Sequence, residues 1–185
     1  LAFMGLFKIS DQMIGVMALP FYLDCGFSKT DIGAVSKIFG VGIGIVGAFA
    51  GGAVVVWLGV QRSLLIAILL GAVSNLLYLL LAMFPANIGV FTAVIAGENL
   101  SGGFLGTAAV AWLSSLVNRE YTATQYALFS SLVALPGKLI GGFSGFMVVS
   151  FGYTAFFIFS TVAIFPALLL FFWLQPRLEK LSSKE

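Results

Sequence analysis

The sequence predicts an all-α membrane protein with six transmembrane helices. Of its 185 residues, 61% are hydrophobic and only 9% are charged, whereas a soluble domain is about 25% charged. The mean hydropathy is +1.12, and the apolar runs are continuous rather than alternating, which is typical of helices and not of membrane β-strands. A spanning helix needs about 20 apolar residues, so this length holds roughly six spans with short connections.

The composition also excludes several classes of function. The chain has no His and a single Cys, Cys25, so it offers no internal disulfide, no zinc site and no Ser–His or Cys–His catalytic pair. It has no G-x-x-x-x-G-K-[ST] run to hold nucleotide phosphates. Its nine Lys and Arg residues are scattered, unlike those of a nucleic-acid-binding surface. We therefore expect a transporter or channel rather than an enzyme, with no metal, cofactor or nucleic-acid partner.

Turn signals divide the apolar chain into segments. In order, the six segments cover about 1–23, 31–58, 63–82, 88–117, 126–150 and 154–174. The run Asp24-Cys25-Gly26 ends the first segment, Pro85 follows the third and Pro176 follows the sixth. We expect a bundle over residues 1–176 and a short cytoplasmic tail over 177–185. Because the chain starts with Leu rather than Met and lacks a basic leader, we expect it to be the interior of a longer protein.

Capping patterns support three of the helix starts. Ser28 and Asp31 precede the second segment with the spacing of a capping box, in which side chains accept hydrogen bonds from unpaired backbone N–H groups. Asn87 is placed as the N-cap of the fourth segment. Thr122 and Gln125 have capping-box spacing ahead of the fifth.

Basic residues predict that both ends of the chain lie in the cytoplasm, because Lys and Arg are retained on the cytoplasmic side of a membrane. The loops on the side of the C-terminus carry five, and the opposite loops carry only Lys29. The five are Arg62, Arg119, Arg177, Lys180 and Lys184. Tryptophan favours the membrane–water interface, and all three tryptophans fall near the predicted cytoplasmic ends of segments: Trp57, Trp112 and Trp173.

Polar residues inside the apolar segments predict which helices surround a polar space. Charge in hydrocarbon is costly, so it faces a bundle interior or a wet cavity and marks function by default. The residues are Lys8, Asp11 and Gln12 in the first segment, Lys37 in the second, Glu98 and Asn99 in the fourth, and Lys138 in the fifth. The third and sixth segments carry no charged residue, so we expect them to touch lipid on most sides.

These residues divide into two candidate roles. Three lysines against two carboxylates suit an anionic solute, and we assign substrate binding to Lys8, Gln12, Lys37, Asn99 and Lys138. The two carboxylates, Asp11 and Glu98, are the candidates for proton coupling. Lys8 lies one turn from Asp11 and holds it ionised, whereas Glu98 has no cation within four residues on its helix and is the better proton-responsive candidate. The alternative interpretation is that each carboxylate pairs with a lysine and only holds helices together.

Small residues four apart let helices approach closely, and glycines with this spacing recur in the chain. The pairs are Gly40 with Gly44, Gly102 with Gly106, and Gly141 with Gly145. The motif K-x-x-G-x-x-x-G occurs at Lys37 and again 101 residues later at Lys138. An inverted repeat of three plus three helices, about 1–85 and 86–176, would produce this recurrence.

At Glu98-Asn99-Leu100-Ser101-Gly102-Gly103, continuing to Gly106-Thr107-Ala108-Ala109, the chain resembles the AmpG-type muropeptide permeases of the major facilitator superfamily. The runs 123–128 and 136–138 and the charged positions of the first two helices fit the same family. The resemblance covers essentially the whole chain and matches only the C-terminal six-helix half of such a permease.

The resemblance implies import of anhydro-muropeptides, which are sugar–peptide fragments of the cell wall, by proton symport across the bacterial inner membrane. The implied partners are the lipid bilayer, an anionic sugar–peptide substrate, protons, and a missing N-terminal six-helix half in the same chain or a separate one, because alternating access rocks one bundle against another. One alternative is a related carrier of another anionic solute such as acetyl-CoA. A channel, which would need a ring of equivalent charges, and a structural membrane subunit are the others.

Overall fold

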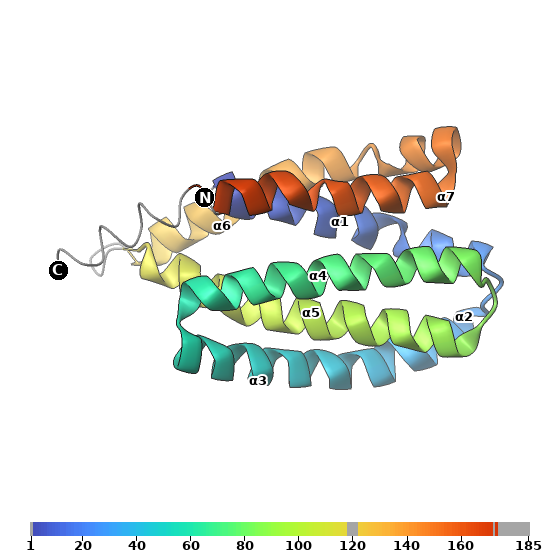
Figure 1. Cartoon of the computed structure of the whole chain (residues 1–185), viewed down its shortest axis with the longest axis horizontal. Helices are drawn as coiled ribbons and strands as arrows, with labels where there is room; N and C mark the ends of the chain where they lie inside the picture. The colour runs from blue at the N-terminus through green and yellow to red at the C-terminus, as the bar shows by residue number, and fades with distance from the viewer. Residues whose placement is uncertain (1, 118–121, 172, 174–185) are drawn as a thin grey trace.

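The computed structural model describes residues 2–117, 122–171 and 173, which form helices packed along a common long axis (Figure 1). In chain order these are α1 (Ala2–Asp24), α2 (Lys29–Gly33), the π-helix η1 (Ala34–Phe39), α3 (Gly40–Leu58), α4 (Val60–Met83), α5 (Ile88–Ser115), α6 (Thr122–Gly141) and α7 (Ser144–Val162), with further helix over 164–171. The described part of the chain contains no strand, and the predicted all-α class is confirmed.

Local sequence signals set two of the helix starts. The Ser28 hydroxyl accepts a hydrogen bond from the Asp31 amide at 3.1 Å, and the Asp31 carboxylate accepts one from the Ser28 amide at 3.3 Å. The Asn87 side-chain oxygen accepts from Gly89 and Val90 at 3.0 and 3.2 Å. Both predicted caps are confirmed. The predicted cap at Thr122 rests on a side chain outside the described set, although α6 begins at that residue.

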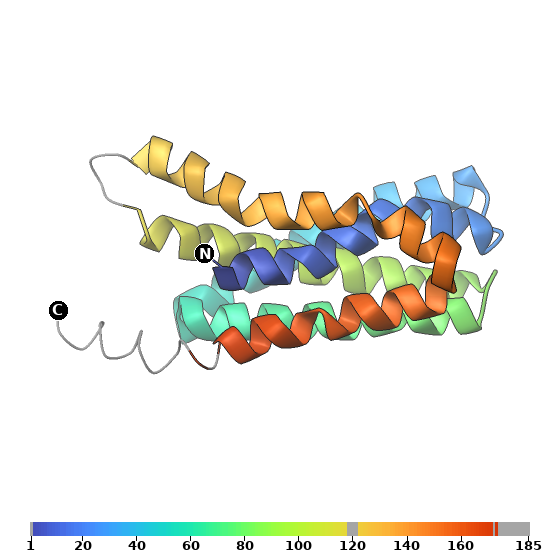
Figure 2. The same cartoon turned by 90° about the horizontal axis from the view of Figure 1, so that it is seen from above.

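Two irregular points shape the last helices. A two-residue turn at Gly142 and Phe143 separates α6 from α7, where the sequence predicted one continuous helix. At Gly152, φ is 79° and ψ is 168°, a backbone conformation open essentially to glycine alone. The chain reverses direction there and returns alongside α4 (Figure 2). Gly152 therefore makes the turn that was predicted between residues 150 and 154.

Among the described residues, four stretches are long and apolar enough to cross a membrane: Lys29–Leu58, Val60–Met83, Ile88–Ser115 and Ser144–Phe171. Helices α1 and α6 are not among them. Polar residues lower the hydropathy of both: Lys8, Asp11 and Gln12 in α1, and Gln125 and Lys138 in α6.

The helices form two groups, α3 with α4 and α5, and α1 with α6 and α7, which meet where α4 contacts α7. α3 packs on α5, α6 packs on α1, and α4 lies beside the returning part of α7 on the face turned to the viewer in Figure 1. Of the four apolar stretches α4 is the most buried within this chain, with 39% of an 18-residue part of it buried, and Lys29–Leu58 is the least, with 11%. The expectation that the third helix is exposed on most sides is therefore wrong within this chain, because α4 contacts α3, α5 and α7.

Glycines bring the backbones of α3 and α5 together. A Cβ atom added to Gly51 would lie 2.7 Å from the carbonyl oxygen of Phe104, and one added to Gly47 would overlap that of Leu100. The Thr107 hydroxyl donates a hydrogen bond across the same contact to the Ala48 carbonyl at 3.1 Å. Only residues without a side chain allow this approach.

The predicted packing glycines behave differently from one another. Gly40 and Gly44 lie against Asn99 of α5, and Gly141 lies against Gln12 and Val16 of α1. Three of them contact no neighbouring helix of the described chain, because a Cβ atom on each would meet nothing within 4 Å, and their packing role stays a prediction: Gly102, Gly106 and Gly145. On α5 it is Gly103, one position along, that turns toward α3.

Candidate functional site

Glu98 is the acceptor at the centre of a hydrogen-bonded group from three helices. Its Oε2 atom accepts from the Tyr78 hydroxyl of α4 at 2.6 Å and from the Tyr22 hydroxyl of α1 at 3.1 Å. The two hydroxyl oxygens are 2.7 Å apart, so the single hydrogen of the Tyr22 hydroxyl can go either to Glu98 or to the Tyr78 oxygen. Glu98 lies ten residues into α5, about 15 Å along the helix axis, which corresponds to the middle of a hydrocarbon layer about 30 Å thick.

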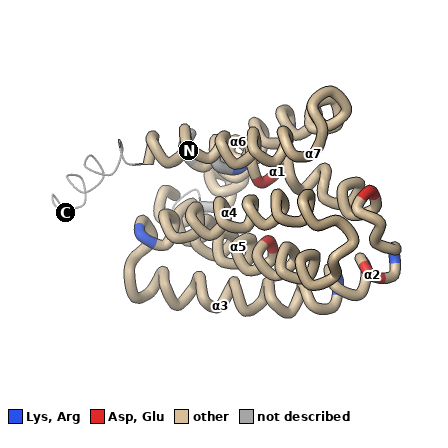
Figure 3. Tube along the Cα trace, turned by 45° about the vertical axis from the view of Figure 1, so that its right-hand side comes forward, with Lys and Arg blue, Asp and Glu red and all other residues tan. Residues whose placement is uncertain are grey.

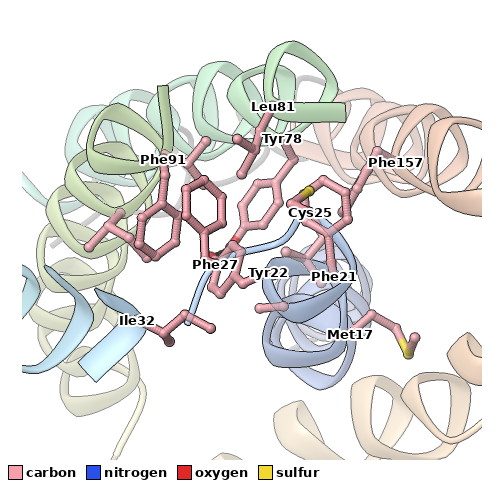
Figure 4. Close-up of a cluster of buried hydrophobic side chains, with 14 of the residues drawn as sticks. Met17, Phe21, Tyr22, Cys25, Phe27, Ile32, Tyr78, Leu81, Phe91 and Phe157 are labelled. Atoms are coloured by element: carbon pink, nitrogen blue, oxygen red, sulfur yellow. Dashed lines mark hydrogen bonds between the residues drawn. The ribbon is translucent and has the colours of Figure 1, made fainter. Parts of the chain in front are cut away.

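Aromatic packing holds the two tyrosines in place. Their rings stack with centroids 6.1 Å apart and planes inclined by 15°. Phe91 meets Tyr22 edge-on at 4.8 Å, and Phe157 packs on Tyr78 at 5.1 Å. Figure 4 shows both tyrosines inside this cluster of buried side chains, which come from α1, the turn after it, α2, α4, α5 and α7. Tyr78 is fully buried, so its hydroxyl has little freedom to leave Glu98.

A small polar cavity of about 30 Å³ lies on one side of Glu98 and is bordered by Asp11 of α1. This volume is enough for a water molecule, and polar side chains around it supply the partners that a buried water needs. At its edge the Asn75 amide donates to the Ser10 hydroxyl at 2.9 Å, and Ser10 donates to the Ser160 carbonyl at 2.7 Å. The cavity therefore brings together the two carboxylates that the sequence assigned to proton coupling.

A larger opening of about 330 Å³ lies on the other side of Glu98, between α1, α2, η1 and α5. Lys37, Ser36 and Asn99 contribute polar groups to it, and Tyr22 and Glu98 line it as well. Glu98 is thus shared by the small cavity and the larger opening. A change in the charge of Glu98 would alter the electrostatic potential in both the small cavity and the larger opening.

The other predicted residues lie at varying distances from this group. Lys8 is close enough to Asp11 for their charges to attract, and Gln12 packs under Gly137 where α6 crosses α1. Lys138 is exposed in the last turn of α6, and no described contact joins it to Glu98. In the described residues no lysine lies within ion-pairing distance of Glu98, whose partners are the two tyrosines. Figure 3 shows how few charged positions the bundle has between its ends.

Sequence reasoning missed the tyrosines. Tyr22 follows Asp11 by eleven residues, which is about three helical turns, so it lies on the same side of α1 as that carboxylate. Tyr78 and Asn75 are one turn apart in a mostly apolar helix, and that pair was the available signal. Neither tyrosine carries a charge, so the cost of burying charge gave no signal for them.

This arrangement suits a carboxylate that gains and loses a proton. A carboxylate paired with a lysine would leave an unpaired buried cation on protonation, which is costly. Tyrosine hydroxyls are neutral and can either donate or accept, so they can bond Glu98 in both of its states. Long apolar helices around such a group are typical of a membrane transporter.

The family comparison gives the same class. The family model described as Major Facilitator Superfamily matches residues 1–185. The chain belongs to the major facilitator superfamily, whose members are transporters rather than enzymes.

Individual relatives indicate which group within the superfamily this chain resembles. A protein named "Putative transporter AmpG 1" from Rickettsia prowazekii (strain Madrid E) is 34% identical over 170 residues, which is 92% of this chain and 38% of that protein. Its namesake from Rickettsia bellii (strain RML369-C) is 32% identical over 97% of this chain and 44% of its own length. An uncharacterized protein of Haemophilus influenzae (strain ATCC 51907 / DSM 11121 / KW20 / Rd) is 38% identical over 95% of this chain and 43% of its own length. The resemblance to AmpG-type proteins is confirmed, and the chain spans about two-fifths of these relatives' length.

Proposed function

We propose that this chain is one half of a proton symporter that imports anhydro-muropeptides across the bacterial inner membrane. The observation that carries the proposal is the position of Glu98, which is bonded by Tyr22 and Tyr78 and borders both polar spaces of the bundle. The substrate class is the one implied by the resemblance to AmpG-type muropeptide permeases, and relatives that carry the AmpG name support it. Protons supply the driving force by way of Glu98 and Asp11, and Lys8, Gln12, Lys37, Asn99 and Lys138 remain the proposed substrate contacts.

The proposed half crosses the membrane six times. Besides the four apolar stretches, α1 crosses with its polar residues turned inward, and α6 crosses together with the part of α7 that precedes Gly152. Support comes from Figure 1, where these segments run parallel to the other helices. The packing of α3 on α5 and of α6 on α1 is what a repeat of residues 1–85 in 86–176 would produce. A companion six-helix half completes the transporter.

Both ends of the chain are proposed to lie in the cytoplasm, which places residue 30 outside the cell and residue 61 inside. In intact cells an impermeant maleimide should label Thr30→Cys at once and Gln61→Cys only after the membrane is opened. Native Cys25 gives little background, because it is buried and because burial, followed by the charge of Asp24, raises the pKa of its thiol. The reverse labelling pattern would show that the orientation is inverted.

Uptake into proteoliposomes tests the transport proposal directly. The transporter assembled from this chain and its companion half should accumulate a labelled anhydro-muropeptide when the outside is more acidic than the inside. A protonophore should abolish the accumulation. Acetyl-CoA serves as the competing solute in the same assay. Accumulation of acetyl-CoA alone, or uptake that ignores the proton gradient, would contradict the proposal.

A further inference from the structure

We infer that the larger opening beside Glu98 is a binding subsite for a zwitterionic amino-acid group. The carboxylate of the ligand would bind at Ser36 and Lys37, and its charged amino group would bind at Glu98 and Asn99. The volume of about 330 Å³ falls at the lower end of the range of small-molecule sites. The inference rests on the proposed function only in assigning this subsite to the peptide part of the substrate.

Ser36 supplies the first argument. Its hydroxyl oxygen is buried, lines the opening and has no hydrogen-bond partner among the described residues. Hydroxyl groups in helices usually bond to a carbonyl in the preceding turn, as Thr92 does at 2.8 Å and Ser131 at 2.8 Å. A buried hydroxyl without a partner costs stability, and a ligand oxygen in the opening would supply the missing bond.

Lys37 supplies the second argument. It is the cation that lines the opening, and no carboxylate of the described residues pairs with it. Ser36 and Lys37 both belong to η1 (Ala34–Phe39), and π-helical turns occur frequently at functional sites. A hydroxyl beside an unpaired ammonium group suits a carboxylate, because charge-assisted hydrogen bonds are stronger than neutral ones.

The opposite wall carries acceptors. The tyrosines bond only Oε2 of Glu98, and among the described residues no hydrogen bond reaches Oε1. The Asn99 amide nitrogen donates to the Ile95 carbonyl at 2.9 Å, which leaves its side-chain oxygen as an acceptor. A cation on η1 therefore faces a carboxylate and an amide oxygen on α5, which matches the two charges of an amino-acid group.

The same charges exclude other ligands from this opening. A polyphosphate would bring several negative charges to one lysine and would be repelled by Glu98. The remaining wall is apolar, with Leu19, Ile32 and Ile95, and Gly15 leaves room beside α1. Such a wall suits a short aliphatic side chain.

Equilibrium dialysis of the assembled transporter at pH 7 tests the inference with three probes: alanyl-alanine, its C-terminal amide, and N-acetyl-alanyl-alanine. The wild type should bind the zwitterion at least about tenfold more tightly than either modified form, since each lacks one of the two charged partners. Lys37→Gln should reduce the affinity for alanyl-alanine to that for the amide. Ser36→Ala should weaken binding of the two free acids by about threefold to tenfold and leave the amide unchanged.

Two variants control the experiment. Lys29→Gln removes an exposed cation of neighbouring α2 that does not line the opening, and it should bind like the wild type. Lys37→Arg keeps the charge and should keep the preference for the zwitterion, which separates a lost contact from a misfolded protein. Equal binding of the three probes, or an effect of Lys29→Gln as large as that of Lys37→Gln, would overturn the inference.

The binding experiment can fail or succeed independently of the test of the proposed function. Zwitterion selectivity that depends on Lys37, without muropeptide uptake, would support the subsite and remove the proposed substrate. Muropeptide uptake by a transporter that binds alanyl-alanine and its amide equally would support the proposed substrate and overturn the subsite. Failure of both measurements would overturn both conclusions.

Discussion

Gly103→Ala should sharply reduce the yield of folded protein. A Cβ atom at this position would overlap the carbonyl oxygen of Gly44 and lie 3.0 Å from the Ala48 nitrogen. Backbone atoms cannot move aside as a flexible side chain can, so α3 must shift away from α5. Inserting a group into a tightly packed contact typically costs about 1–3 kcal/mol and occasionally more. Thermal unfolding of the detergent-purified protein, with the monodisperse yield, measures the loss.

The neighbouring glycine provides the matched control. A Cβ atom on Gly102 meets nothing within 4 Å of the described chain, and alanine is the better helix former by about 1 kcal/mol. Gly102→Ala should therefore leave the melting temperature unchanged or raise it slightly. If both substitutions destabilise the protein equally, the cause is the loss of glycine itself and not the contact between α3 and α5.

Glu98→Gln should give a transporter that still exchanges substrate, with weaker binding because the ligand loses one charged partner, but that cannot accumulate it. A proton difference of one pH unit is worth about 1.4 kcal/mol, which sustains roughly a tenfold accumulation for each coupled proton. Glutamine keeps the shape of the side chain and can still accept a hydrogen bond from Tyr22 or Tyr78, but it cannot carry the proton. Gradient-driven uptake and substrate counterflow, measured on the same proteoliposomes, separate coupling from binding.

Two further variants sharpen this result. Tyr78→Phe removes the 2.6 Å hydrogen bond and leaves the carboxylate in place, so accumulation should survive with an altered dependence on pH. Asp11→Asn tests the other carboxylate of the small cavity. Normal accumulation by Glu98→Gln would show that Glu98 is not the coupling residue. The coupling residue would then be Asp11 if Asp11→Asn loses accumulation. If Asp11→Asn also accumulates substrate normally, the coupling residue lies in the companion half.

The sequence predicted the features that depend on local signals. The caps at Ser28 and Asn87 need only a side chain and the backbone of the next turn, so their spacing was sufficient. The polar residues of α1 and α5 were identified because charge inside an apolar run is rare and costly. Composition and continuous apolar runs were enough for the all-helical class.

Features that depend on tertiary contact were beyond the sequence. The partners of Glu98 come from α1 and α4, 76 and 20 residues away along the chain. The sequence of a helix does not indicate which neighbouring helix its tyrosine will contact. Spacing identified glycines on α5 but not the side that α3 covers, which is why Gly102 and Gly106 were chosen where Gly103 makes the contact. The π-helix had no signal in the residues from Ala34 to Phe39.

The π-helix makes the length of this segment matter more than its composition. A π-turn contains about one residue more than an α-turn, so removing any one residue between 34 and 39 would allow an ordinary α-helix to form. The deletion and the change of helix type would cancel, so the helix beyond it would keep its orientation relative to α2. An α-helix formed over all six residues would instead rotate that helix by roughly 100°, since an α-helix has about 3.6 residues per turn. Gly47 and Gly51 would then turn away from α5, and bulky side chains would take their place. We therefore expect homologous proteins that lack the π-helix to be one residue shorter in this segment.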